Sequence, residues 1–518
     1  MNEKNKSKWY WRLLRWGLIG LAVLVTLVAV LVTEEDWRGK HDWEACRHAA
    51  EARGERFDVA SVIPPVVPDD QNFFCAPIVA ETLESERNME PSEQRATNAV
   101  NRLNFDIYRR QYIDSITEND ITWQRGKLTD SNLLKQWQTA FRTFSATPEG
   151  KTNGFPVAAQ SQTPAADVLL ALSIFNPALE ELRQASLRPY ARIPLHYENG
   201  FDSVGELLPW LANMKRSAHF LQLRMLAELQ NNQGDQALAD LELLLRLNDS
   251  VRQQPFLISQ LVRIAILQYL LQPFYEGLAQ HDWSDAQLLD LEQALAKEDF
   301  LADYQFVLNG EKLFAIEKFE RQRITRQMRS VEDNSDIIVT NSLVWWPDAM
   351  FYQNELCFAQ LDESMSAIIE KENRLVAPTA LSEFLANVQV QRQHYSPYKV
   401  LALAMAPAVA SSVKKFAFAQ FDVDVARVAC ALERYRLAHG EYPATLDALA
   451  PQFIEKVPHD IIGGQPLHYR LADDGRFVLY SVGWNAKDDG GTVALTKNGS
   501  VDRDNGDWVW QYPANVRQ

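Results

Sequence analysis

The most uniform hydrophobic stretch of the chain lies close to its N-terminus. Residues 13–33 read LLRWGLIGLAVLVTLVAVLVT, and no charged residue occurs from Trp16 to Val32. A helix of this length rises about 30 Å, which is the thickness of the hydrocarbon core of a bilayer. A core helix of a soluble protein would rarely be so uniformly apolar, because it needs a polar face. The pattern predicts one transmembrane helix over residues 13–33, after a basic tail over residues 1–12.

The charges on either side of this stretch predict its orientation. Basic residues precede it and acidic residues follow it at once: Lys4, Lys6, Lys8, Arg12 and Arg15 before, and Glu34, Glu35 and Asp36 after. The positive-inside rule therefore places the N-terminus in the cytoplasm and everything after residue 33 outside. A cleaved signal peptide would have a shorter apolar region and a small-x-small cleavage site, whereas Thr33-Glu34-Glu35 follows here. An uncleaved anchor is the favoured interpretation.

The pattern beyond the anchor is mainly helical and predicts an extracytoplasmic α-helical domain over residues 34–395. A charged helix comes first and a proline-rich linker over residues 62–72 follows it. In residues 217–247, apolar residues recur at spacings of three and four on both sides of an NNQGD turn, which predicts a helical hairpin similar to one tetratricopeptide unit. Ser284, with Gln287 three residues later, predicts a capped helix start. Further helices are expected over residues 301–330 and 346–372.

A second apolar run, over residues 400–413, contains Pro407 and is followed by Lys414 and Lys415. Fourteen residues are short for a bilayer span, so the run predicts a buried or interfacial helix. The chain therefore crosses the membrane once in this interpretation.

The pattern of the last part of the chain, residues 396–518, predicts a small α+β domain. A helix ends at His439-Gly440, and Tyr442-Pro443 begins a turn. A short helix near residues 446–450 comes next. Two strand-like runs, PLHYRLA and RFVLYSVG, surround an Asp473-Asp474-Gly475 turn, and the remainder is acidic and rich in loops.

This order resembles the globular domain of type II secretion pseudopilins, especially the major pseudopilin. The matching segments are ALERYRLAHGEYPATLDAL, VPHD, GQPLHY and FVLYSVGWN, which together cover roughly 100 of the 518 residues. The chain lacks a prepilin cleavage signal, and some 380 residues separate the apolar helix from this domain. The resemblance therefore implies a pseudopilin-type domain on an anchored protein and makes fibre assembly doubtful. Residues 57–81 also resemble a segment of uncharacterised bacterial envelope proteins, so the bacterial inner membrane is the expected location.

The pseudopilin family ends its domain in a calcium-binding loop, and acidic loops occupy the corresponding region here. Ca²⁺ binds six to eight oxygen atoms of carboxylates, amides and carbonyls held by a flexible loop. Asn485, Asp488 and Asp489 lie in one loop, and Asp502, Asp504 and Asp507 lie in another. These six residues are the candidate ligands of a structural Ca²⁺ ion, and a solvated acidic tail with Asp-Gly turns is the alternative.

Composition excludes some functions and indicates no activity. The chain carries 52 Lys and Arg against 68 Asp and Glu, a net charge of −16. Residues 1–15 carry +4, which leaves −20 for the rest of the chain. An acidic chain without a basic patch beyond its N-terminus is a poor binder of nucleic acid. Four cysteines would all lie outside, where they could form disulfides in any of three pairings or stay buried as free thiols.

Three short motifs suggest catalysis or metal binding, and each lacks a required partner. Gly150-Lys151-Thr152 ends like a phosphate-binding loop, but Ser145 replaces its first glycine. His41, Glu44 and His48 share one helical face without forming a zinc motif. Residues 411–414 match S-x-x-K without its S-D-N or K-T-G partners.

The sequence thus leaves two hypotheses for function. The favoured one is a single-pass envelope protein that binds or scaffolds other proteins, with secretion machinery as a candidate neighbour. The alternative is an extracytoplasmic hydrolase whose active site is assembled from residues far apart in sequence, around histidines and carboxylates of perturbed pKa in a cleft. The substrate or ligand is unknown in both.

Overall fold

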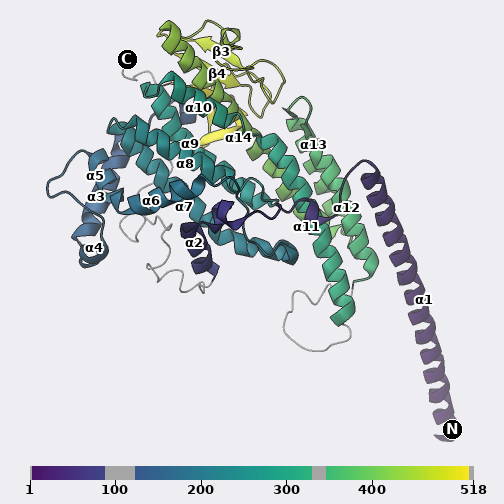
Figure 1. Cartoon of the computed structure of the whole chain (residues 1–518). Helices are drawn as coiled ribbons and strands as arrows, with labels where there is room; N and C mark the ends of the chain where they lie inside the picture. Colours follow the sequence, from purple (N-terminus) through teal and green to yellow (C-terminus); the bar gives the residue numbers. More distant parts are fainter. Residues whose placement is uncertain (1–2, 88–122, 330–345, 513–518) are drawn as a thin grey trace. The chain divides into compact units, whose positions relative to one another are not determined.

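The computed structural model of the chain describes residues 3–87, 123–329 and 346–512, and it is mainly helical (Figure 1). A small amount of sheet lies near the C-terminus. The helices in chain order are α1 (Glu3–Ala52), α2 (Pro77–Arg87), α3 (Ser131–Ala146), α4 (Pro148–Asn153), α5 (Pro164–Leu172), α6 (Asn176–Ser186), α7 (Ser203–Gln230), α8 (Gly234–Asp249), α9 (Leu257–Gln280), α10 (Asp285–Leu295), α11 (Phe300–Arg329), α12 (Asp348–Ser366), α13 (Pro378–Gln393) and α14 (Val400–His439).

The chain divides into two compact units that are discontinuous in sequence. The first unit comprises residues 1–62, 312–365 and 383–410, and the second comprises residues 63–311, 366–382 and 411–518. Helices α11, α13 and α14 each contain a boundary between the units. The units therefore alternate along the chain, in contrast to the linear division at residue 396 that the sequence pattern suggests.

The first unit is built on the C-terminal half of α1. Trp43 of α1, Ile316 of α11 and Tyr352 of α12 form its buried apolar cluster, and Phe57 packs against this cluster. Lys312 is almost fully buried, and its Nζ lies 3.1 Å from carboxylate oxygens of both Glu55 and Asp362. The charged segment after the predicted span is thus the part of α1 that packs against protein.

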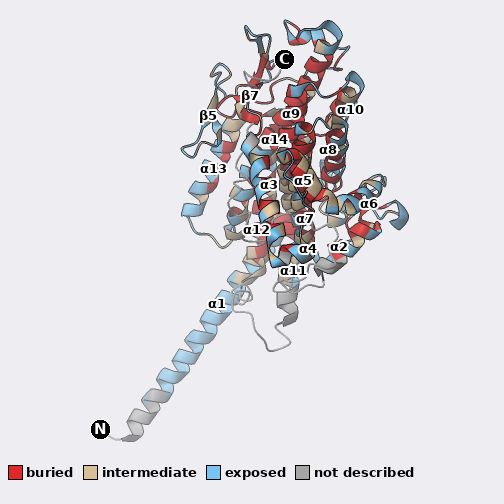
Figure 2. Ribbon diagram, turned by 90° about the vertical axis from the view of Figure 1, so that its left-hand side faces the viewer, coloured by how far each residue is buried: buried red, intermediate tan, exposed pale blue. Residues whose placement is uncertain are grey.

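The second unit holds the predicted helical hairpin and most of the buried residues. Helices α7 and α8 meet at a turn in which Asn232 has a positive φ of 56°, and both helices also pack against α9. Ser284 caps α10 in the predicted capping box with Gln287. Nearly every residue of α14 from Phe416 to Arg434 is buried, as the red colour of this helix in Figure 2 shows. A helix that is buried on all sides needs no polar face, so this helix shows no simple amphipathic pattern in its sequence.

The predicted helix over residues 400–413 is the beginning of α14. Ala402, Ala406 and Ala410, which are four residues apart and share one helical face, are fully buried there. The helix continues without interruption to His439, so the apolar run and the helix expected after residue 416 are one element. The helices expected over residues 301–330 and 346–372 correspond to α11 and α12, although α12 ends six residues early. Ser330 lies outside the described residues.

The C-terminal sheet contains more strands than the sequence pattern predicts. The expected hairpin is present as β3 (His468–Leu471) and β4 (Phe477–Ser481), paired antiparallel. The acidic region expected to be loop also contains β5 (Val493–Leu495), β6 (Val501–Gly506) and β7 (Trp508–Gln511). Strand β7 pairs with β4, and β5 pairs with β6. The first of these pairings completes a three-stranded sheet in which β4 is central and fully buried. A two-stranded ribbon, β1 (Ile369–Glu370) with β2 (Leu375–Val376), lies elsewhere in the second unit.

Candidate functional site

The apolar part of α1 is exposed along its whole length. Three helices in the described part of the chain are long and apolar enough to cross a membrane, namely α1, α9 and α14. The apolar windows of α9 and α14 are half or more buried inside protein, whereas no residue of the α1 window is buried. A long helix that exposes apolar side chains on all sides is stable only in nonpolar surroundings. Helix α1 therefore has the length, composition and exposure of a membrane anchor.

Asp507 organises the first of the two loops proposed for calcium. This residue lies between β6 and β7, and its side chain is almost fully buried. Its carboxylate accepts hydrogen bonds from the backbone N–H groups of Asp489 (3.1 Å), Gly491 (2.6 Å) and Thr492 (3.2 Å). Gly490 and Gly491 have φ of 73° and 76°, a backbone region that favours glycine and turns these groups toward the carboxylate. The structure thus brings Asp489 and Asp507 together.

Asn485 and Asp488 lie in the same loop as Asp489. Asp488 accepts hydrogen bonds from the Tyr480 hydroxyl (3.3 Å) and from Gly490 N–H (2.9 Å). Asp489 accepts from the Asn485 amide (3.0 Å) and pairs with Lys487 Nζ at 2.7 Å. Four of the six candidate ligands therefore belong to one loop cluster, with the lysine as its counter-charge.

The other two candidate ligands, Asp502 and Asp504, lie on β6 and have different partners. Asp502 accepts from the N–H of Asp504 and from the side chain of Asn505, both at 3.0 Å. Asp504 forms an ion pair with Lys414 of α14 at 2.7 Å. In the part of the chain that the structure describes, no three or more His, Cys, Asp or Glu side chains are grouped so that they could hold a metal ion. The calcium site stays a prediction.

Residues of the segment ALERYRLAHGEYP meet around the buried carboxylate of Glu433 on α14. Arg436 binds this carboxylate with Nε and Nη2 at 2.6–3.2 Å, and the Tyr442 hydroxyl donates to it at 3.0 Å. His281, at the C-terminal end of α9, contributes a fourth contact through Nδ1 at 2.8 Å. Burial raises the pKa of Glu433, but the hydrogen bonds from His281 and Arg436 outweigh it and leave this pKa lowered. The segment thus fixes the turn after α14 and ties it to α9.

His281 and Glu433 are a histidine–carboxylate pair of the kind used in general base catalysis. Both Glu433 oxygens, however, already accept hydrogen bonds from Arg436, and one also accepts from Tyr442. His281 itself occupies the left-handed cap position of α9, with φ of 59°. This arrangement joins α14 to α9 through His281 and to the turn after α14 through Tyr442, while Arg436 on the same helix compensates the charge of the carboxylate.

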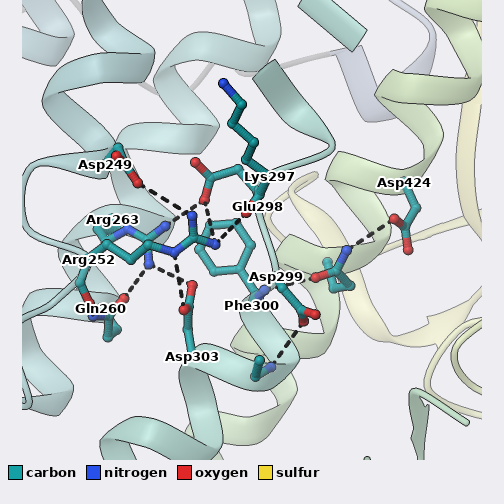
Figure 3. Close-up of polar contacts among 12 residues, drawn as sticks. Asp249, Arg252, Gln260, Arg263, Lys297, Glu298, Asp299, Phe300, Asp303 and Asp424 are labelled. Carbon is teal, nitrogen blue, oxygen red and sulfur yellow. Dashed lines mark hydrogen bonds and ion pairs between the residues drawn. The ribbon is translucent and has the colours of Figure 1, made fainter. Parts of the chain in front are cut away.

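The second unit contains buried ion pairs that the sequence pattern does not predict. One network of them surrounds Arg263 of α9 (Figure 3). The Arg263 guanidinium is fully buried. It contacts Glu298 (2.5 Å), Asp303 (2.7 Å) and Gln260 (2.6 Å), and it lies 5.0 Å above the Phe300 ring. Burial raises the pKa of Glu298 despite its basic neighbours. Charges taken out of water must be paired in this way.

Two other buried carboxylates of the second unit have strongly raised pKa values. Burial and the charge of Asp240 raise the pKa of Glu228 to about 8, although Arg224 lies 2.9 Å away. Burial raises the pKa of Asp422 on α14 to about 7, and its carboxylate accepts a hydrogen bond from Gln268 at 2.6 Å. Each lies against neighbouring helices, so both groups join secondary-structure elements.

Glu355 of α12 differs from these residues because its carboxylate has no partner. The residue is fully buried in the first unit, and neither of its oxygens has a hydrogen-bond partner among the described residues. Burial, together with the charge of Glu320, raises the pKa of Glu355 to about 8, although Arg323 and Arg47 favour its ionised form. A carboxyl group with this pKa is mostly protonated at neutral pH, and its ionised form carries a desolvation cost.

The three motifs weighed for catalysis and metal binding lie in ordinary helices. Gly150-Lys151-Thr152 belongs to α4, which Thr147 caps. On α1, His41 stacks on Trp37, Glu44 pairs with Lys40, and His48 pairs with Glu51, so each member of the candidate zinc face has a separate neighbour. Residues 411–414 lie within α14. All four cysteines are free thiols, and Cys357 and Cys430 are buried.

Comparisons with protein-family models, with curated proteins and with solved structures find no match to this chain. Function must therefore be argued from the chain's own residues.

Proposed function

We propose that this chain is a single-pass protein of the bacterial inner membrane that binds or scaffolds other proteins of the cell envelope. One observation carries the proposal: α1 combines two environments in a single uninterrupted helix. Its residues from Trp16 to Leu31 are exposed and carry no charge, whereas Trp43 and Ala50 on the same helix are buried in the first unit. The helix thereby joins a membrane span directly to a folded unit, without a flexible linker.

Two features of the second unit support a scaffolding role. The α7–α8 hairpin, which we propose to be tetratricopeptide-like, belongs to a class of helical hairpins that commonly present surfaces to other proteins. The proposed pseudopilin-like part is held to α9 and α10 by ion pairs, among them Arg427–Glu292 (2.8 Å) and Arg434–Asp285 (2.8 Å). We propose that it is a fixed module of this protein, beside secretion machinery, and not a subunit that assembles into fibres.

Reporter fusions test the address and orientation. An alkaline phosphatase fused after residue 518 should be active in bacteria, because the positive-inside rule places that end outside the cytoplasm. The same enzyme fused after residue 12 should be inactive, and a cytoplasmic fluorescent reporter should show the opposite pattern at both positions. A fluorescent reporter that works at the C-terminus, together with an inactive phosphatase there, would overturn the proposed topology.

We also propose that the loop cluster of Asn485, Asp488, Asp489 and Asp507 binds a structural Ca²⁺ ion. Supporting this proposal, the four residues share one loop cluster and offer three carboxylates and an amide, the oxygen ligands that Ca²⁺ prefers. Among the described residues these side chains are not grouped as a metal site, so an ion would have to draw them together. The full chain should unfold at a higher temperature in millimolar Ca²⁺ than in EGTA, because a ligand that binds only the folded state stabilises it.

The variant Asp488→Asn should lose this calcium-dependent shift, since it removes one carboxylate without changing the side-chain size. Asp473→Asn, at the exposed turn between β3 and β4, is the matched control and should keep the shift. An unfolding temperature that is equal in Ca²⁺ and EGTA for the wild-type protein would remove calcium from the proposal and leave the fold unaffected.

A further inference from the structure

The contacts of α1 determine which end of the first unit lies nearest to the membrane. The Asp36 carboxylate accepts a hydrogen bond from the backbone N–H of Ala349 at 2.7 Å, in the first turn of α12. The neighbouring Glu35 lies 3.5 Å from the Tyr398 hydroxyl, in the connection between α13 and α14. Gly39 lies so close to Ala349 that an added Cβ would be 3.1 Å from its Cα. These contacts place the start of α12 and the α13–α14 connection beside residues 35–39 of α1.

That level of α1 corresponds to the headgroup layer of a bilayer spanned by residues 13–33. Asp36 lies three residues beyond Thr33, which is about 4.5 Å along the helix axis. The interfacial layer on each side of the hydrocarbon core is about 5–7 Å thick. The beginning of α12 and the α13–α14 connection therefore lie at the level of the headgroups, whereas Glu55 and Asp362 mark the opposite end of the unit.

The side chains at this level are of the types that enter membrane interfaces. Tyr395 is 77% exposed in the α13–α14 connection, and Trp37 is 67% exposed on α1. Trp346, just before α12, is half-buried, and Lys399 is exposed. Tyrosine and tryptophan place an apolar ring and a polar tip across the headgroup region, and lysine can reach lipid phosphates. We call these four residues the membrane-proximal face.

Helix α11 ends on the same side of the unit. The part of α11 that belongs to the first unit begins at Lys312, at the end distant from the membrane. Farther along the helix, the guanidinium of Arg323 lies 4.5 Å above the ring of Tyr352, in the first two turns of α12. The backbone of α11 continues for six more residues to Arg329, or about 9 Å toward the membrane. In Figure 1 the end of α11 points the same way as the N-terminal half of α1.

We propose that the membrane-proximal face rests in the headgroup layer of the same membrane that α1 spans, with Tyr395 and Trp37 inserted among the phospholipids. This inference rests on the proposed membrane span and adds a second contact with the lipid. The occupant is a lipid surface, because the face is continuous with the span and combines amphipathic aromatic rings with the exposed Lys399. Such a contact would hold the first unit at a fixed angle to the membrane.

Fluorescence quenching in lipid nanodiscs tests the proposal with the full chain. Single cysteines are introduced into a Cys46→Ser/Cys75→Ser background that unfolds at the wild-type temperature, and each is labelled with the environment-sensitive dye NBD. The positions are Tyr395→Cys and Trp37→Cys on the face, and Glu363→Cys as the control in the same unit. Glu363 is 73% exposed and lies 14 residues along α12 from Ala349, which is about 21 Å.

In nanodiscs that contain phosphatidylglycerol and lipids spin-labelled near the headgroup, NBD at positions 395 and 37 should be quenched. The NBD emission at these two positions should also lie at shorter wavelength than that of free NBD dye in buffer. NBD at position 363 should show neither the quenching nor the shift. Equal, negligible quenching at positions 395 and 363 would overturn the inference.

A fourth variant separates this failure from failure of the anchor itself. Leu24→Cys lies in the middle of the proposed span and is 58% exposed in the structure. Lipids spin-labelled deep in the acyl chain should quench NBD at position 24. If position 24 is quenched and position 395 is not, the span stands and the membrane-proximal face does not contact lipid. If position 24 is not quenched, the proposed membrane span itself is wrong.

Discussion

Replacing Arg263 with alanine should destabilise the second unit by roughly 3–5 kcal/mol, the range found when one partner is removed from a buried ion pair. The guanidinium is fully buried and contacts both Glu298 and Asp303. Without it, the pKa of Glu298, which burial already raises, should rise further, because Arg252 is a more distant partner at 3.8 Å. The uncompensated carboxylate must then bind a proton or admit water.

The loss can be measured as a fall in the unfolding temperature or as faster proteolysis of the second unit. Arg246→Ala is the matched control: this arginine is also helical and paired, with Glu242 at 3.5 Å, but the pair is exposed on α8. Exposed pairs of this kind contribute about 0–1 kcal/mol. A cost at Arg263 no greater than that at Arg246 would contradict the argument from burial.

A double variant examines the cause of the loss. In Arg263→Met/Glu298→Met, the most buried charge pair is replaced by apolar side chains, and we expect part of the stability lost in Arg263→Ala to return. Buried ion pairs can often be replaced as a whole at little cost, whereas removing one member leaves a buried charge. A double variant that is less stable than Arg263→Ala would show that lost packing, and not the unpaired carboxylate, causes the destabilisation.

Replacing Glu355 with glutamine should stabilise the first unit at pH 8 and change little at pH 4. The pKa of Glu355 is raised from 4.5 to about 8 in the folded protein. The stabilisation linked to this raised pKa is fully present below pH 4.5 and is lost as pH rises to about 8. The difference between pKa values of 4.5 and about 8 corresponds to roughly 5 kcal/mol at pH values above both. Glutamine has a similar shape and stays neutral, so it removes this pH dependence.

The measurement is the difference in unfolding temperature between Glu355→Gln and wild type from pH 4 to pH 9. Other buried carboxylates, including Glu228 and Asp422, add their own pH dependence to both proteins and cancel in the difference. Glu363→Gln is the control, because Glu363 is exposed on the same helix. A difference that does not grow between pH 4 and pH 8 would show that Glu355 is ionised or hydrated in the folded protein.

Local sequence patterns predict the elements that depend on neighbouring residues alone. The apolar stretch over residues 13–33, the turn between α7 and α8, the Ser284 cap and the β3–β4 hairpin each depend on a short window. Of the six candidate calcium ligands, Asn485, Asp488 and Asp489 share one loop, as their spacing suggests. Asp507, which its spacing groups with Asp502 and Asp504, instead lies against that first loop in the fold. Strand β6, VDRDNG, was missed because Asp, Asn and Gly have weak strand propensity, for which its pairing with β5 compensates. Strands β5 and β7 are apolar runs of only three and four residues between polar turns, too short to show a strand pattern by themselves.

The sequence by itself determined that this chain is mainly helical, carries a helix fit to span a membrane, and contains a small C-terminal sheet. Hydrophobic periodicity, caps and turns are local properties, so one sequence suffices to recognise them. Only the tertiary structure decided which charges are buried and that Asp36 contacts the start of α12. It also decided that, among the described residues, Glu355 has no hydrogen-bond partner whereas Arg263 has three. These features join residues up to several hundred positions apart, and such contacts arise from packing, which no local pattern encodes.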